Sequence, residues 1–153
     1  MIASDVHLAF VAELCRMQMD GGRDFLHENH GRARSWERQP MAEIASDPRV
    51  RKFVGDQCQY GQQPFKGNPV GKSTGWMGKS FGIFRGPKRR CRGQRGDCSR
   101  SGGGRHETAS GRVAREAAIY PFKLCRAMLE GCRNQLRRNG HLNDGMHGFQ
   151  GRA

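Results

Sequence analysis

The sequence is poor in apolar residues and in acidic charge. Hydrophobic residues make up 35% of its 153 residues, the mean hydropathy is -0.81, and 22 residues are glycine. We therefore expect a small core confined to a few segments, joined by long irregular connections. The sequence has 14 Asp and Glu but 27 Lys and Arg, which gives a formal net charge of +13. This excess indicates a polyanionic partner, although a basic surface that binds nothing has the same composition.

Three further features are missing. There is no run of 18 or more apolar residues, so we expect no membrane span. The first residues lack a basic region followed by an apolar stretch and a cleavage site, which favours a soluble intracellular protein, cytoplasmic or nuclear. The six cysteines include no CxxC pair. In a reducing compartment they are expected to be reduced, buried or metal-bound rather than paired in disulfides.

A phosphate-binding P-loop is also absent. The segment 67–74 resembles one, but three residues separate Gly67 from Gly71 where the motif needs four. Pro69 removes a backbone amide from a loop whose function depends on amides, and no apolar strand precedes the segment. We therefore do not expect ATP or GTP binding.

Four segments have the pattern of helices, at about 4–19, 39–46, 112–119 and 121–139. The second is expected to begin near Gln39 or to be kinked there, because Pro40 cannot lie deep inside a helix. Residues with helical period predict the core-facing side of the first and last helices: Val6, Phe10, Leu14 and Met17, with Val11 and Cys15 alongside, in the first, and Leu124, Met128, Cys132 and Leu136 in the last.

Short apolar runs at 23–26, 50–54 and 72–77 predict three strands. The fold class is therefore α/β, with a small, mostly parallel sheet of about three strands and three or four helices. We assign 1–140 to one domain and 141–153 to a flexible tail. Residues 81–111 are rich in Gly and Arg and form an irregular basic insert. The composition of this insert is equally typical of disorder.

Four polar residues, 27–30, follow the first predicted strand. In an extended segment His27 and Asn29 point away from Glu28 and His30, so these four residues do not form a metal site. A carboxylate at a strand end can instead act as a hydrogen-bonding acid toward a base or sugar, provided burial favours its protonated form. A solvated loop Glu is the alternative.

The order of several weak motifs over about residues 5–131 carries a resemblance. They are an apolar strand followed by Glu28 and Asn29, the segments 56–61 and 72–77, then Cys91, Cys98 and His106, and finally 111–112 and 120–125. This order resembles cytosine DNA methyltransferases of the phage type, and methyltransferase-like segments of transposon polyproteins in algae. The resemblance implies a partial Rossmann-like methyltransferase domain.

The resemblance also implies roles. Glu28, with Asn29 beside it, would contact a flipped-out cytosine and assist attack on its ring, with S-adenosylmethionine as the cofactor. No cysteine here follows a proline, so the family's nucleophile is missing, as is its glycine-rich cofactor turn. Both would lie upstream of Met1, in a missing N-terminal half. We expect a catalytically incomplete mobile-element fragment that does not bind the cofactor alone, and whether it is an enzyme stays open. The alternatives are a non-enzymatic nucleic-acid-binding module or a decayed reading frame.

A zinc site is the second candidate centre. Cys58, Cys91, Cys98 and His106 could supply its four ligands, and a metal would explain how a segment so poor in apolar residues acquires structure. Inert thiols and a surface histidine are the alternative, because the spacing of the four is irregular.

Basic residues predict contacts with nucleic-acid phosphates, most of all with DNA. Those we assign to DNA binding, together with one threonine, are Arg32, Arg34, Lys72, Thr74, Lys88, Arg89, Arg90, Arg92 and Arg95.

Overall fold

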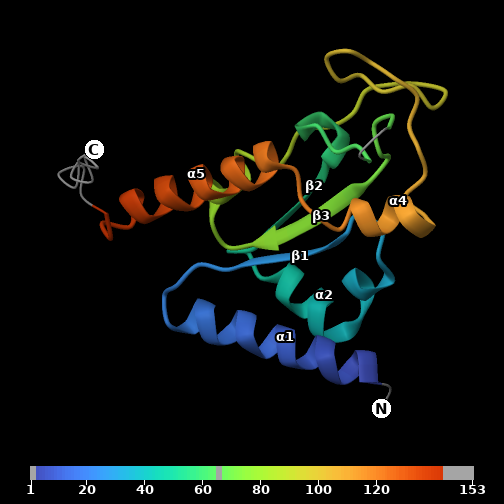
Figure 1. Cartoon of the computed structure of the whole chain (residues 1–153). Coiled ribbons are helices and arrows are strands. Elements are labelled where there is room, and N and C mark those ends of the chain that lie inside the picture. Colours follow the sequence, from blue (N-terminus) through green and yellow to red (C-terminus); the bar gives the residue numbers. More distant parts are fainter. Residues whose placement is uncertain (1–2, 65–66, 143–153) are drawn as a thin grey trace, which may run out of the picture.

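The computed structural model describes residues 3–64 and 67–142. Within these residues it has a three-stranded sheet with helices on both faces, which confirms the expected α/β class (Figure 1). The helices are α1 (Ala3–Asp20), α2 (Gln39–Ser46), α3 (Phe81–Phe84), α4 (Gly111–Glu116) and α5 (Phe122–Arg138), with 3-10 turns η1 (Arg34–Glu37) and η2 (Gln57–Tyr60). The strands are β1 (Leu26–His30), β2 (Arg51–Asp56) and β3 (Ser73–Gly78).

The prediction of a mostly parallel sheet was wrong. The strand order is β1-β3-β2, and the central β3 is antiparallel to both neighbours. The helical crossover through α2 does leave β1 and β2 running in the same direction, as its pattern predicts. However, in the described residues between β2 and β3, 57–64 and 67–72, the one helical element is the short turn η2. β3 therefore returns between the two outer strands in the opposite direction.

The sheet separates two hydrophobic clusters. On one face, α1 and α2 pack against Met77 and Trp36. Gly75 makes this contact close, because a Cβ at this position would lie 2.8 Å from the Trp36 ring. On the other face, α5 packs Leu124 against Trp76 and Tyr60. Alternate residues of β3 therefore contribute to the two clusters, as the pleat of a strand requires.

The predicted core-facing side of α1 was wrong except for Val11 and Cys15. Cys15 is buried and Val11 packs against the core, but the other four predicted residues are exposed. The buried side consists of Leu8, Ala12, Cys15 and Met19. Both sets have helical spacing, so periodicity alone cannot choose between them. Small residues at positions 12 and 15 explain the choice, since they let α1 approach Met41 and Ile44 of α2.

The predicted core-facing side of α5 is confirmed in part. Leu124 is buried and Met128 packs against its cluster, while Leu136 is 40% exposed. Gly131 is buried because α3 crosses α5 there, with a Cβ at this position lying 2.8 Å from the backbone of Ile83. Apart from residues 141 and 142, the predicted tail lies outside the described residues. None of the described helices is long and apolar enough to cross a membrane.

Candidate metal centre

Four side chains predicted as zinc ligands converge in the structure. Cys58 comes from η2, directly after β2, and Cys91, Cys98 and His106 come from the irregular segment that follows α3. One ligand atom from each lies within 4.8 Å of the other three. The cluster can therefore hold a metal ion, and the segment around it is folded rather than disordered.

Backbone hydrogen bonds bring the last two ligands together. The Cys98 amide donates to the Gly104 carbonyl at 2.8 Å, and the His106 amide donates to the Gly96 carbonyl at 2.7 Å. Between these two ligands the chain reverses at Gly102 and Gly103, whose φ angles are 83° and 59°, so Cys98 and His106 lie on the two antiparallel arms of a hairpin-like loop. An earlier turn at Arg95 and Gly96, with φ angles of 54° and 93°, lies between Cys91 and Cys98. Positive φ at both central residues is typical of the type I′ turn of hairpins.

Asp56, at the end of β2, fixes the position of Cys91. Its amide donates to the Arg89 carbonyl at 2.9 Å, and its carboxylate accepts from the Cys91 amide at 2.8 Å. The same carboxylate forms an ion pair with Arg90 at 3.1 Å. These contacts hold the segment 89–91 against the end of β2. Cys91 therefore lies beside Cys58, which follows β2.

A glycine permits this close approach. A Cβ built on Gly55 would overlap the carbonyl oxygen of Pro87. We expect Gly55→Ala to push the segment after α3 away from β2, at a cost of about 1–3 kcal/mol typical of overpacking. Zinc affinity should fall even though all four ligands are intact. Competition with a colorimetric zinc chelator measures the change. Unaltered affinity in the variant would contradict the role of this contact.

Two of the distances between ligand atoms are close to those of tetrahedral zinc. Sulfur atoms about 2.3 Å and a nitrogen about 2.0 Å from a tetrahedral zinc ion lie about 3.8 Å (S to S) and about 3.5 Å (S to N) apart. In the structure the Cys91 and Cys98 sulfurs are 3.8 Å apart, and Cys91 Sγ lies 3.6 Å from His106 Nε2. The sulfur separation is far too long for a disulfide, whose S–S bond is about 2.05 Å.

Hydrogen-bond donors surround the sulfurs as they do in metal sites. Ser99 donates to Cys91 Sγ from its amide at 3.4 Å and its hydroxyl at 3.5 Å, and the Arg100 amide donates to Cys98 Sγ at 3.5 Å. Burial alone would raise the pKa of the Cys91 thiol, but the Ser99 donors and a further amide bond from Gly93 outweigh it and lower the pKa to about 6. Cys91 is thus prepared to bind metal as a thiolate.

Cys58 is the most deeply buried ligand. Burial and the neighbouring sulfurs raise the pKa of its thiol, while the Gln59 amide donates to its sulfur at 3.6 Å. A cavity of about 220 Å³ lies beside the cluster and is lined by Lys72 and Ser73 as well as by three of the ligands. A tetrahedral ion bound by all four side chains would have no open position for substrate, as in structural zinc sites.

The predicted catalytic pair does not form a comparable site. Glu28 lies within β1 opposite Trp76, and its side chain is exposed, so the burial that an acid role requires is missing. Burial, and then the neighbouring Glu28 carboxylate, raise the pKa of Tyr120. Asn29 faces the other side of the sheet, where its amide donates to Ser35 at 2.8 Å.

The predicted phosphate contacts fall into three groups. Five are exposed residues of the segment after α3, namely Lys88, Arg89, Arg90, Arg92 and Arg95. Arg32 and Arg34 are exposed beyond the end of β1. Lys72 is half-buried, and its ammonium donates to the Ala117 carbonyl at 2.8 Å. Thr74 is completely buried and accepts from the Gln57 amide at 2.8 Å, so it is not available to DNA in this structure.

Sequence reasoning missed the supporting contacts of Asp56, Gln59 and Ser99, because no local motif marks a residue that binds a distant sulfur or amide. Comparison with protein families, with curated proteins and with solved structures finds no match to this chain. Its function is therefore inferred from the arrangement of its side chains.

Proposed function

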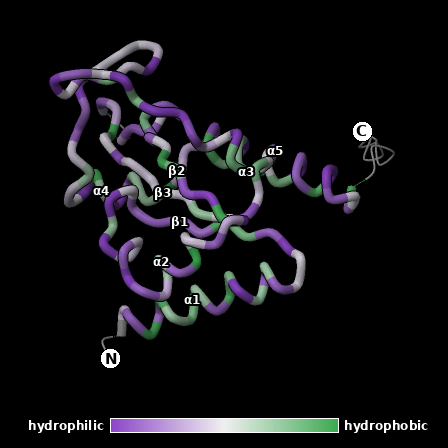
Figure 2. Tube along the Cα trace, turned by 180° about the vertical axis from the view of Figure 1, so that it is seen from behind, coloured by the Kyte–Doolittle hydropathy of each residue, from purple (hydrophilic) through white to green (hydrophobic). Residues whose placement is uncertain are grey.

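We propose that the chain is a non-enzymatic nucleic-acid-binding module whose basic loop is held in shape by a zinc ion on Cys58, Cys91, Cys98 and His106. The observation that carries this proposal is the convergence of these four ligand atoms within 4.8 Å. The basic loop, residues 85–108, is called the metal lobe below. It projects from one end of the sheet, and most of its residues are hydrophilic (Figures 1 and 2).

The metal lobe concentrates positive charge. Between residues 85 and 105 there are eight Lys and Arg and one acidic residue, Asp97. Arg90 is paired with Asp56. In the described chain, Lys88, Arg92, Arg95 and Arg105 are exposed and have no ion pair within 4.0 Å. Cations without protein partners on a loop fixed by metal suit contact with phosphates, which is independent of sequence.

Zinc would supply the folding energy of the metal lobe rather than chemistry. The chain would fill all four coordination positions of the ion, and structural zinc ions stabilise small domains that lack a core. The ligands would thus set the positions of the arginines, and binding to nucleic acid would depend on the metal indirectly.

Removing two lobe arginines tests the phosphate role. For Arg92→Ala with Arg95→Ala we expect weaker binding to DNA and a slope of log affinity against log salt that is smaller by about 2, because each lost phosphate contact contributes about 0.9. Fluorescence anisotropy over a salt series measures both.

A matched control removes the same charge elsewhere. Arg112 and Arg126 are already paired with Glu116 and Glu130 on α4 and α5, at 3.5 and 3.1 Å. Their double alanine variant should keep the salt slope. Equal losses in the two double variants would mean that net charge, and not the metal lobe, governs binding.

The methyltransferase role of Glu28 stays a prediction. No contact among the described residues bears on S-adenosylmethionine, and no cysteine follows a proline to act as the nucleophile. Labelled methyl transfer to DNA by the purified chain would favour that role over the binding module.

A further inference from the structure

A second basic cleft lies away from the metal centre, between β2, α3 and the end of α5. Its volume is about 480 Å³, within the range of ligand sites. Arg51, Arg85, Lys88 and Arg138 line it together with three phenylalanines, and no carboxylate is among the lining residues. Lys52 also borders the cleft, but its ammonium lies 4.4 Å from the Trp36 ring centroid, on the other face of the sheet. The cleft therefore presents four cations and an aromatic wall.

Phe81 is the exposed part of that wall. Its side chain is 60% exposed, whereas the three residues that follow it in α3 are buried. α3 is held tightly on α5, since the Gly82 amide donates to Gln135 at 3.0 Å and Ile83 packs at Gly131. The Arg51 guanidinium lies 5.5 Å from the Phe81 ring centroid. Phe81 is thus an exposed aromatic platform on a firmly packed helix, with a cation over one face of its ring.

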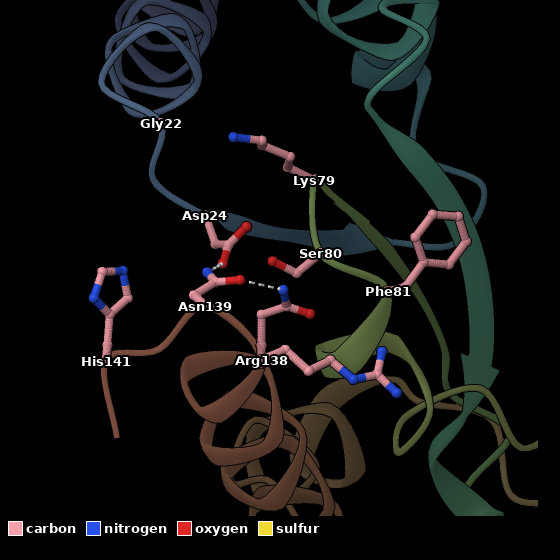
Figure 3. A pocket seen from close by; sticks show the side chains of 9 residues that line it. Gly22, Asp24, Lys79, Ser80, Phe81, Arg138, Asn139 and His141 are labelled. Carbon is pink, nitrogen blue, oxygen red and sulfur yellow. Dashed lines mark hydrogen bonds between the residues drawn. The ribbon is translucent and has the colours of Figure 1, made fainter. Parts of the chain in front are cut away.

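A neighbouring cavity of about 530 Å³ shares Phe81 and Arg138 with the cleft (Figure 3). Ser80 lines it with a hydroxyl that is buried and has no hydrogen-bond partner in the described part of the chain. Opposite, the Asn139 amide donates to the Asp24 carboxylate at 2.8 Å. The unpaired Ser80 hydroxyl, which can donate and accept, and the remaining lone pairs of Asp24 are groups of the kind that the edge of a nucleobase bonds to.

We infer that this cleft binds single-stranded nucleic acid, with a base stacked on Phe81 and the backbone on Arg51, Arg85, Lys88 and Arg138. The inference rests on the proposed function and specifies its ligand. Proteins that bind single strands combine a positively charged groove with aromatic side chains on which bases stack. A duplex hides its base faces, so an exposed aromatic platform gains little from it.

The cleft is continuous with the metal lobe along the chain. Lys88 lines the cleft and is followed directly by Arg89 and Arg90, which lead to the metal ligand Cys91. A single strand can therefore run from the aromatic platform to the metal lobe, with phosphates contacted along the way.

The experiment compares a labelled oligothymidine of about 12 nucleotides with a duplex of the same length, at about 50 mM salt, by fluorescence anisotropy. We expect Phe81→Ala to weaken single-strand binding about 5- to 100-fold, the range found for loss of one base stack, and to change duplex binding less than about two-fold. Phe81→Trp should bind the single strand at least as tightly as the natural chain. Phe10→Ala is the matched control, because Phe10 is also 60% exposed but lies on α1, across the sheet.

The outcomes separate the two proposals. Equal binding of single strand and duplex, with no effect of Phe81→Ala, would overturn this inference and leave the nucleic-acid-binding function standing. Equal losses in the Phe10 and Phe81 variants would also overturn it. Absence of binding to both oligonucleotides by the zinc-loaded chain would refute the proposed function itself.

Discussion

Removal of zinc is expected to unfold the metal lobe while leaving the sheet intact. Apart from Pro87, Cys91 and Cys98 the lobe contains no apolar side chain, so it has no core of its own. Structural zinc ions bind with apparent free energies of about 10–16 kcal/mol in small peptides, far more than the remaining hydrogen bonds of such a loop provide. The sheet keeps both of its hydrophobic clusters, which do not include the lobe.

Limited digestion with trypsin, with and without a chelator, measures this effect. The metal-free chain should be cut rapidly within 85–108, and amide exchange there should become fast. Cys98→Ser should behave like the metal-free chain and bind less than one zinc per molecule. Cys125→Ser is the control, because Cys125 is half-buried outside the cluster and its loss should leave one bound zinc. Protection of the lobe that persists without metal would refute the structural role of zinc.

The ligands of this centre could be predicted from the sequence, but their geometry could not. Thiols and an imidazole near a segment poor in apolar residues make a metal site one candidate, while their irregular spacing leaves inert thiols as the alternative. Their convergence depends on a turn at Arg95 and Gly96 and on Asp56. The Asp56 carboxylate accepts a hydrogen bond from the Cys91 amide, 35 positions away in the sequence. No local pattern in the sequence marks either contact.

In the fold, too, some features could be predicted from the sequence and others could not. Helix positions follow from periodicity and from breakers such as Pro40, so α2 begins at Gln39 as predicted. The buried side of α1 and the direction of β3 depend on which distant partner packs against each, and two choices had equal local support. The sheet placed Glu28 inside a strand rather than after one, since pairing with β3 extends β1 to His30.

Replacement of Trp76 by alanine is expected to cost the most stability of any single substitution in the sheet. Trp76 is 1% exposed, and its ring meets Tyr120 edge-on with centroids 6.1 Å apart. It is also the centre of the cluster that joins Leu124 of α5 to the sheet. Loss of a buried Trp side chain typically costs about 3–5 kcal/mol, a large fraction of the roughly 5–15 kcal/mol that stabilises a domain.

Thermal unfolding followed by circular dichroism, with zinc held constant, measures this loss. The midpoint of Trp76→Ala should fall by roughly 10 °C in a chain of this size. Phe122→Ala is the control, because Phe122 is 77% exposed on the same helix that Trp76 anchors, and its loss should change stability by less than about 0.5 kcal/mol. Trp76→Phe should lie between the two. Equal midpoints for Trp76→Ala and Phe122→Ala would refute the anchoring role of Trp76 and mean that α5 is held to the sheet by other contacts.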